Sequence, residues 1–401
     1  MAFLMASVLF TPSNAATKRE KVEGFSAERQ LNYCVEKVRM ALDGLKGGKA
    51  APDYTKQPRN ITDGYQWNCR EARAEEWCSG FWPGVLWMAY ASSGDNSLLE
   101  AAKGYTETLS FVGRQPVYDH DLGFIVINSY LKGIEAMGDK APANYKATAL
   151  AAADSLATLF NAKAGTLLSW PRHVKDYQGH NTIMDNMINL ELLLWASENG
   201  GSRLLRNIAI SHATTTMRHH FREDGSCYHV AVYDTLTGDF LRGQTHQGYA
   251  DHSMWSRGQS WAIYGYTMMY RYTHDRVFLD FAQKVTDIYL RRLRETSDDW
   301  VPRWDMDDPR PYAPKDASAA CVVASALIDL AEYVGGWRGE YYRQCAVDML
   351  TDLSSERYLS GKRNVAFLLH STGHHPAGSE IDASIIYADY YYIEALEKIK
   401  F

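Results

Sequence analysis

Apolar residues recur along this chain with helical spacing, and alternation of period two is scarce. Twelve segments combine that spacing with caps and breakers at their ends. They cover residues 26–45, 80–93, 95–113, 121–138, 142–160, 184–199, 201–220, 257–273, 275–294, 316–334, 338–356 and 382–398. The pattern predicts an all-α protein.

The twelve segments alternate between two kinds. One kind is apolar on most faces, as in GFWPGVLWMAY (80–90) and NMINLELLLWAS (186–197). The other is amphipathic and charged, as in DRVFLDFAQKVTDIYLRRL (275–293). A helix that is apolar all round is buried, and an amphipathic helix faces water on one side. Six of each predict an (α/α)6 barrel of six inner and six outer helices; a helical solenoid would give a similar alternation without a closed inner ring.

The first residues have the pattern of a signal peptide. Phe3 to Phe10 form a short apolar run, and Ser13-Asn14-Ala15 is a small-x-small cleavage site. We therefore expect residues 1–16 to be a signal peptide, residues 17–401 to be one catalytic barrel domain, and the protein to be periplasmic or secreted. No later run of about 20 uninterrupted apolar residues suggests a membrane span.

Composition narrows the class of function. The net charge is -6 with acids and bases interspersed, so no basic block indicates a nucleic-acid partner. The 11 Trp and 26 Tyr suit a carbohydrate binder, because flat rings stack on sugars, although they suit ordinary core packing equally well. None of the six cysteines has zinc-site spacing, and one or two disulfides stay open if the protein is exported.

Polar residues gather at the starts of the six apolar helices. These starts read EEWCSGFWPG (75–84), YDHDLGF (118–124), TIMDNMIN (182–189), DHSMWSRGQSW (251–261), APKDASAA (313–320) and GSEIDAS (378–384). If the inner helices run parallel, the starts meet at one end of the barrel. A pocket there would be lined by Trp, Asp, His, Arg and Gln, which suits a sugar.

Aspartate at a helix start is usually an N-cap. That structural role is the better interpretation for Asp316 and Asp382. Asp121 and Asp185 are instead candidate catalytic acids, because His120 and Gly123 add nothing to a cap and Asp185 lies in apolar surroundings. Capping lowers a carboxyl pKa, whereas burial and a second carboxylate raise it, and the sequence leaves open which effect wins.

One cation also begins an apolar helix. Arg257 either forms an internal salt bridge with Asp251 or Asp316, or clamps an acidic sugar. His229, His246 and Gln247 lie in the long connection 221–256, where either surface polarity or substrate contact explains them.

These segments resemble a known family. SGFWPGVLWMAY, HDLGF, IMDNMINLELLLWASENGG, THQGYADHSMWSRGQSWAIYGY, VPRWDMD and GSEIDASIIYADYYYIEAL follow one another as in the unsaturated glucuronyl hydrolases, glycoside hydrolase family 88. The resemblance runs from about residue 60 to the C-terminus. It implies an (α/α)6 barrel that hydrates the C4=C5 double bond of a 4,5-unsaturated uronic acid at the non-reducing end of a lyase-generated oligosaccharide.

The resemblance also implies roles for single residues. Asp185 matches the general acid/base, and Asp121 matches a second aspartate that assists it. The matching substrate contacts are His120, Trp170, His229, His246, Gln247, Arg257 and Trp261, with Trp77 and Trp82 near the pocket mouth. The substrate is the only partner implied, and no metal or organic cofactor is.

One segment departs from what a sulfated substrate needs. HSTGHHPAGSEID (370–382) should contact the leaving saccharide, and it offers His374 and His375 but no Lys or Arg. Three alternatives stay open. They are a hydrolase of unsaturated galacturonyl-rhamnose from pectin, a sugar epimerase using His246 and His374 as bases, and a glycan-binding protein without catalysis.

Overall fold

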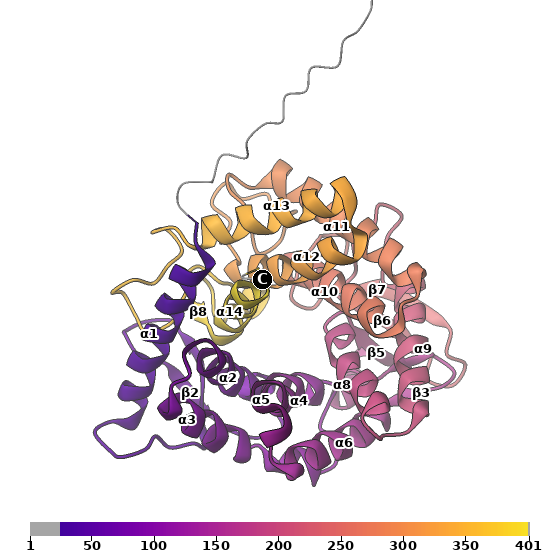
Figure 1. The fold of residues 1–401 in the computed structure, drawn as a ribbon. Coiled ribbons are helices and arrows are strands. Elements are labelled where there is room, and N and C mark those ends of the chain that lie inside the picture. The colour runs from indigo at the N-terminus through magenta and orange to yellow at the C-terminus, as the bar shows by residue number, and fades with distance from the viewer. Residues whose placement is uncertain (1–24, 400–401) are drawn as a thin grey trace, which may run out of the picture.

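Two concentric rings of helices form the protein, and the predicted (α/α)6 barrel is confirmed (Figure 1). The computed structural model describes residues 25–399, so the predicted signal peptide lies outside the described residues. The outer ring consists of α1 (Ala27–Lys46), α3 (Asn96–Glu107), α6 (Ala143–Ala157), α9 (Arg203–His219), α11 (Arg276–Thr296) and α13 (Gly336–Leu353). The inner ring consists of α2 (Phe81–Ser93), α4 (Leu122–Val126) with α5 (Lys132–Met137), α8 (Asn186–Glu198), α10 (Ser256–Thr273), α12 (Ala317–Val334) and α14 (Ile386–Ile399).

The inner helices are buried because they are apolar on every side. In α12 every residue from Ala317 to Ile328 is buried, and each fully buried Leu or Val contributes about 1.5–3 kcal/mol. α12 is also the one described helix that is long and apolar enough to cross a membrane, yet 78% of it is buried inside the protein. Its apolar surface is therefore covered by the neighbouring helices.

Short strands connect the rings at the end where the inner helices begin. β5 (His180–Ile183), β6 (Val230–Tyr233) and β7 (Phe240–Gln244) form an antiparallel sheet. A second sheet has the order β2 (Asn68–Glu71), β1 (Lys56–Ile61) and β8 (Ser384–Ile385), and β3 (Phe160–Asn161) pairs with β4 (Thr166–Leu167). The remaining short elements are α7 (Val174–Tyr177), the π turn Ile127–Leu131 and the 3-10 turns Trp77–Gly80, Ser110–Gly113, Gly138–Lys140, Pro171–His173 and His375–Ala377. The scarcity of period-two alternation did not exclude strands this short.

One predicted helix start is displaced. The last inner helix was expected from residue 382 but begins at Ile386, because Ser384 and Ile385 pair with β1. Asp382 is therefore no N-cap, contrary to expectation. Its carboxylate accepts a hydrogen bond from His370 at 2.5 Å. Asp316 does cap α12, since its side chain accepts from the Ser318 backbone N–H.

Four buried aromatic rings pack against one another below the polar helix starts. Phe81, Phe124, Trp261 and Tyr391 come from α2, α4, α10 and α14, and each is at most 1% exposed. Their centroids form a closed circuit: Phe81–Phe124 5.8 Å, Phe124–Trp261 5.3 Å, Trp261–Tyr391 5.5 Å and Tyr391–Phe81 6.1 Å. These separations are typical of favourable ring pairs. We call this layer the aromatic floor.

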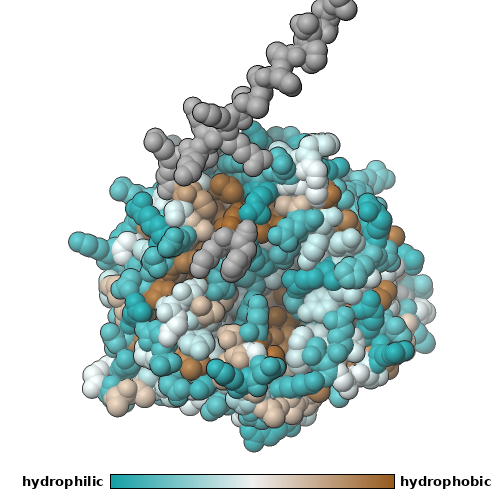
Figure 2. Space-filling view, viewed as in Figure 1, coloured by the Kyte–Doolittle hydropathy of each residue, from teal (hydrophilic) through white to brown (hydrophobic). Residues whose placement is uncertain are grey.

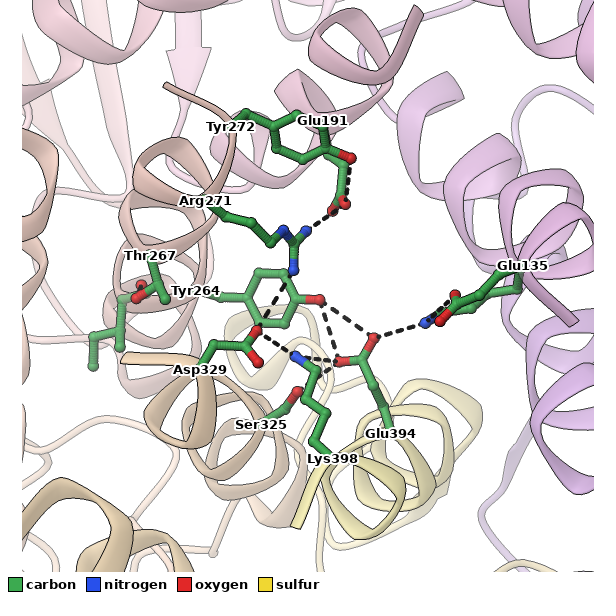
Figure 3. Close-up of polar contacts among 12 residues, drawn as sticks. Glu135, Glu191, Tyr264, Thr267, Arg271, Tyr272, Ser325, Asp329, Glu394 and Lys398 are labelled. Carbon is green, nitrogen blue, oxygen red and sulfur yellow. Dashed lines mark hydrogen bonds and ion pairs between the residues drawn. The ribbon is translucent and has the colours of Figure 1, made fainter. Parts of the chain in front are cut away.

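Charged residues fill the opposite end of the inner ring, where its helices finish (Figure 3). Glu394 accepts hydrogen bonds from the Ser325 hydroxyl at 2.6 Å and the Tyr264 hydroxyl at 3.2 Å. Arg271 pairs with Glu191 at 2.5 Å, and Lys398 pairs with Asp329 at 2.7 Å. This far-end network links α8, α10, α12 and α14, so the inner ring is tied at both ends. In the matching surface view, polar side chains cover the rim and apolar ones show toward the middle (Figure 2).

All six cysteines lie in the described part of the chain, and none is bridged to another. Five of them are buried. The disulfides that the sequence left open do not form in this structure.

Candidate active site

Two aspartates occupy cap positions without capping. Asp121 precedes α4 and Asp185 precedes α8, and neither side chain accepts a hydrogen bond from its helix. Each carboxylate instead faces an imidazole: Asp121 Oδ1 lies 3.5 Å from His120 Nε2, and Asp185 Oδ2 lies 3.5 Å from His229 Nε2. The distinction between these two aspartates and Asp316 is therefore confirmed by the geometry.

The β5–β6–β7 sheet brings together residues that are far apart in the sequence. β5 runs directly into Asp185, and the Met184 backbone N–H donates to the His229 carbonyl at 3.0 Å. β7 leads into His246 and Gln247. Neighbouring strands are only about 5 Å apart. This pairing therefore brings His229, which precedes β6, and His246, which follows β7, toward Asp185.

The proton of His229 has one possible position when the ring is neutral. Its Nδ1 accepts the Gln247 backbone N–H at 3.1 Å, so Nε2 carries the proton and points it at Asp185. His229 therefore stabilises Asp185 as a carboxylate.

The two carboxyl groups have opposite pKa shifts. Burial raises the pKa of Asp121 well above its usual value, and the nearby Asp119 and Asp185 carboxylates raise it further. Burial alone would also raise the pKa of Asp185, but His229, His120 and Arg257 together lower it below its usual value. These shifts favour the protonated form at Asp121 and the carboxylate at Asp185. Environments that separate two carboxyl groups in this way typify acid/base pairs.

Trp170 forms a wall beside the pair. Its ring lies 4.9 Å from His246, 6.2 Å from His229 and 6.4 Å from His120. Tyr177 stacks on Trp170 at 6.0 Å, and its hydroxyl lies 3.1 Å from His246 Nδ1. The arrangement provides a flat apolar face with polar tips, as sugar sites require.

Trp77 stands above the aromatic floor and is partly exposed. Its ring contacts Phe81 at 5.5 Å, Phe124 at 5.3 Å and Tyr387 at 5.1 Å. Trp261 belongs to the floor itself. Trp77 and Trp261 therefore lie at the same end of the barrel as the two aspartates, as predicted.

Several buried polar atoms at this end have no hydrogen-bond partner within residues 25–399. They are His120 Nε2, His229 Nε2, Asp185 Oδ2 and Trp261 Nε1. Buried polar atoms are nearly always paired in native proteins. Their convergence indicates that a polar ligand or water completes the site.

The structure agrees with only one of the two interpretations of Arg257, the internal salt bridge. Its Nη1 donates to Asp316 at 2.6 Å and to the Thr372 carbonyl at 2.6 Å, and its Nη2 donates to the Gly373 carbonyl. The guanidinium is only 2% exposed. The internal salt bridge to Asp316 is thus the observed state, and a free clamp on the sugar is not. Arg257 still lies close enough to lower the pKa of Asp185.

Trp82 does not belong with the site. It is 1% exposed and its ring meets Tyr105 of α3 at 6.1 Å, between the inner and outer rings. One residue in a helix turns the side chain by about 100°, so Trp82 points outward where its neighbour Phe81 points inward. Gln247 does reach the site, with its Nε2 donating to the Gly373 carbonyl at 3.2 Å.

Two further residues join the aspartates without having been predicted. Asp119 is buried and pairs with Arg172 at 2.7 Å, and its Oδ1 accepts the Asp121 backbone N–H at 3.0 Å. Asn189, one turn into α8, lies 2.9 Å from His120 Nδ1. The sequence signal was present in both cases, as a second Asp in YDHD and as an amide within an apolar helix.

No group of three or more His, Cys, Asp or Glu residues that could hold a metal occurs within residues 25–399. The expectation that no metal or organic cofactor takes part stays a prediction.

An (α/α)6 barrel that holds two buried carboxyl groups with opposite pKa shifts beside Trp and His side chains is the arrangement expected of a carbohydrate-processing enzyme. The chain belongs to Glycosyl Hydrolase Family 88, whose model matches residues 53–400. The resemblance seen in the sequence is confirmed.

Relatives agree with this assignment. The chain is 40% identical over 328 residues to the unsaturated glucuronyl hydrolase of Formosa agariphila, covering 81% of this chain and 80% of that protein. It is 31% identical to the unsaturated chondroitin disaccharide hydrolase of Streptococcus pyogenes, covering 93% of each. The crystal structure of an unsaturated glucuronyl hydrolase specific for heparin superposes with a TM-score of 0.83, at 37% identity over 93% of this chain and 96% of that one.

Proposed function

We propose that the protein releases 4,5-unsaturated uronic acid from the non-reducing end of glycosaminoglycan-type oligosaccharides by hydrating the C4=C5 bond. The observation that carries this proposal is a buried carboxyl pair whose surroundings shift the two pKa values in opposite directions, upward at Asp121 and downward at Asp185. Hydration of an enol ether requires one group that gives a proton and one that takes a proton from water.

The reaction balances with water as the only co-substrate. A proton adds to C4, and the resulting positive charge is shared between C5 and the ring oxygen. Water adds to C5 and loses its proton to a carboxylate. The hemiketal opens by cleavage of the C5–ring oxygen bond, and the hemiacetal then left at C1 collapses to an aldehyde and expels the remaining saccharide.

Asp185 acts in this scheme as the general acid/base, and Asp121 as its proton store. The lowered pKa of Asp185 favours its carboxylate, which can accept the proton of water. To protonate C4 it first needs a proton. A like charge raises a carboxyl pKa, so a uronate bound next to Asp185 would favour protonation of Asp185.

The surroundings of the leaving saccharide favour little or no sulfate. His375 stacks on Trp304 with centroids 4.1 Å apart, and its Nε2 lies 2.9 Å from Arg310 Nη2. Arg310 supplies the cation that segment 370–382 lacks, but Asp308 neutralises it through a bond to Nε at 2.9 Å. A sulfate here would meet a cation whose charge Asp308 already offsets.

The experiment is to incubate the protein with unsaturated disaccharides from hyaluronan, chondroitin, heparin and pectin. Loss of the ultraviolet absorbance of the conjugated double bond on the glycosaminoglycan products is expected, with unsulfated forms turned over fastest. Loss on the pectin product alone would assign the galacturonyl-rhamnose activity instead. Isomerisation without loss of the double bond would indicate an epimerase, and no change with intact protein would leave only binding.

A variant tests the role of Asp185. Asp185→Asn should abolish turnover while keeping the fold and the binding of substrate. Asp275→Asn is the matched control, because Asp275 caps the outer helix α11 and asparagine caps equally well. Near-normal turnover by Asp185→Asn would overturn the assigned acid/base.

Export is part of the same proposal. It is supported by the apolar run Phe3–Phe10 and the small residues that follow it. N-terminal sequencing of protein recovered from the periplasm or medium should find residues 1–16 removed, and an intact N-terminus on cytoplasmic protein would contradict it.

A further inference from the structure

We propose that Asn189 is a positioning residue that sets which nitrogen of His120 carries the proton and, through His120, which oxygen of Asp121 does. The inference rests on the proposed function and adds a proton path to it. The Asn189 amide bonds to the Phe124 backbone and to His120, and it also lies close enough to Asp121 to lower the pKa of that carboxyl.

The orientation of the Asn189 amide is fixed by the backbone. The Phe124 backbone N–H donates to Asn189 Oδ1 at 2.7 Å. A backbone N–H can only donate, so the atom that faces it is the amide oxygen. The other end, Nδ2, then points at His120 Nδ1, 2.9 Å away.

This amide determines the tautomer of His120. Nδ2 can only donate, so His120 Nδ1 must accept. Burial lowers the pKa of His120 to about 3, and the ring is therefore neutral in the working range. The single ring proton must lie on Nε2, which has no hydrogen-bond partner in residues 25–399 and faces Asp121 Oδ1 at 3.5 Å.

The tautomer in turn selects an oxygen of Asp121. An N–H directed at Oδ1 favours that oxygen as an acceptor, so a protonated Asp121 carries its hydrogen on Oδ2. Oδ2 is then the atom that can pass a proton to Asp185 or the sugar. With the opposite tautomer, His120 Nε2 would be an acceptor and would draw the Asp121 proton toward itself.

The packing around Asn189 is built for this contact. A Cβ placed on Gly123 would lie 2.6 Å from the Asn189 Cβ, so only glycine allows α4 and α8 to approach this closely. His229 has the same arrangement, but there the donor to Nδ1 is the Gln247 backbone N–H, which only proline would remove. Of the two imidazoles, His120 beside Asp121 is therefore the one whose tautomer a side-chain substitution can change.

The decisive variant is Asn189→Asp. It keeps an oxygen for the Phe124 N–H but places an acceptor against His120 Nδ1, which reverses the tautomer. We expect kcat to fall at least about tenfold, with about 10⁴-fold as the cost known for a wrong tautomer in a catalytic triad, and KM to change less than kcat. The uncharged Asn189→Ala should give a mixture of tautomers and a smaller loss.

A double-mutant cycle separates positioning from mere structure. In a His120→Gln background the residue that replaces histidine can turn its amide either way. Asn189→Asp should then cost less than about threefold. Equal losses in both backgrounds would mean that Asn189 acts by packing or directly on Asp121, and would overturn the proposal.

The tautomer can be read without substrate. Nitrogen-15 spectra of histidine-labelled protein distinguish the two ring nitrogens, and the His120→Gln spectrum identifies the His120 signals. We expect the proton on Nε2 in the parent and on Nδ1, or on both nitrogens, in Asn189→Asp. A proton that stays on Nε2 alone in that variant would refute the inference.

Asn186→Asp is the matched control. It adds the same charge three residues earlier on α8, where the Asn186 amide donates to Ser169 Oγ at 3.2 Å and to the Leu167 carbonyl at 3.3 Å. The His120 tautomer should be unchanged, and an equal change would attribute the effect to charge. An inactive parent protein would refute the proposed function while these spectra still decided the inference.

Discussion

Arg257 should be needed for stability before it is needed for binding. Both partners of its pair are almost fully enclosed, with Arg257 2% and Asp316 0% exposed. Arg257→Met leaves the Asp316 carboxylate buried without its counter-ion. It also frees the carbonyls of Thr372 and Gly373, and the Gly373 carbonyl is the one that accepts from Gln247. The expectation is therefore a loss of folding stability together with a loss of activity.

The magnitude follows from the burial of the pair. Removing one partner of a buried salt bridge costs about 3–5 kcal/mol. For a domain of this size the unfolding entropy is about 0.8 kcal/mol per kelvin, so Tm should fall by roughly 4–6 °C. Thermal unfolding followed by circular dichroism measures this, with KM and kcat taken well below Tm.

The double variant Arg257→Met/Asp316→Asn tests the cause. Asparagine still caps α12 and carries no charge, so much of the lost stability should return although the guanidinium is absent. A Tm within about 1 °C of the parent for Arg257→Met, with only KM raised, would refute the reasoning and restore Arg257 as a free clamp on the substrate.

Three further predictions concern pH and packing. Burial would raise the pKa of Glu394, but its lysine partners lower it to about 2, so its stabilising contribution is complete above the unfolded pKa of about 4.3 and is lost as pH falls toward 2. Glu394→Gln should lower Tm at pH 6 and flatten the fall of Tm in acid. Burial lowers the pKa of His180 and His220 to about 4, so the unfolded chain binds more protons than the folded one between about pH 6.5 and 4. Tm should therefore fall as the pH is lowered through that window, even before the carboxylates titrate. Gly123→Ala should push Asn189 away from His120, lowering kcat and costing about 1–3 kcal/mol of stability by overpacking.

The double ring could be predicted because it depends on local patterns. Helical periodicity gave the twelve helices, and the contrast between apolar and amphipathic members assigned them to the inner and outer rings. The helix starts then predicted that Asp121 and Asp185 would meet, because parallel inner helices begin at the same end.

Contacts between distant segments could not be predicted in this way. The strands β5 and β6 have four residues each and pair across the whole of α8 and α9, so no local pattern specifies them. Asp382 fits a cap as well as Asp316 does, and only the pairing of Ser384 and Ile385 with β1 decides between them. The direction of Trp82 depends on one residue of helix register.

The aromatic floor has a consequence for which molecules the enzyme can serve. Phe81, Phe124, Trp261 and Tyr391 pack together beneath the aspartates, so under the proposed function we expect a saccharide to enter and leave by the same opening. A pocket closed at its base admits the tip of a chain and never its middle. Under the proposed function, throughput therefore depends on the number of chain ends and not on the mass of polysaccharide. Each cut by a lyase creates one new chain end on which this enzyme can act. The saccharide nearer the opening leaves before the keto acid that lies beneath it.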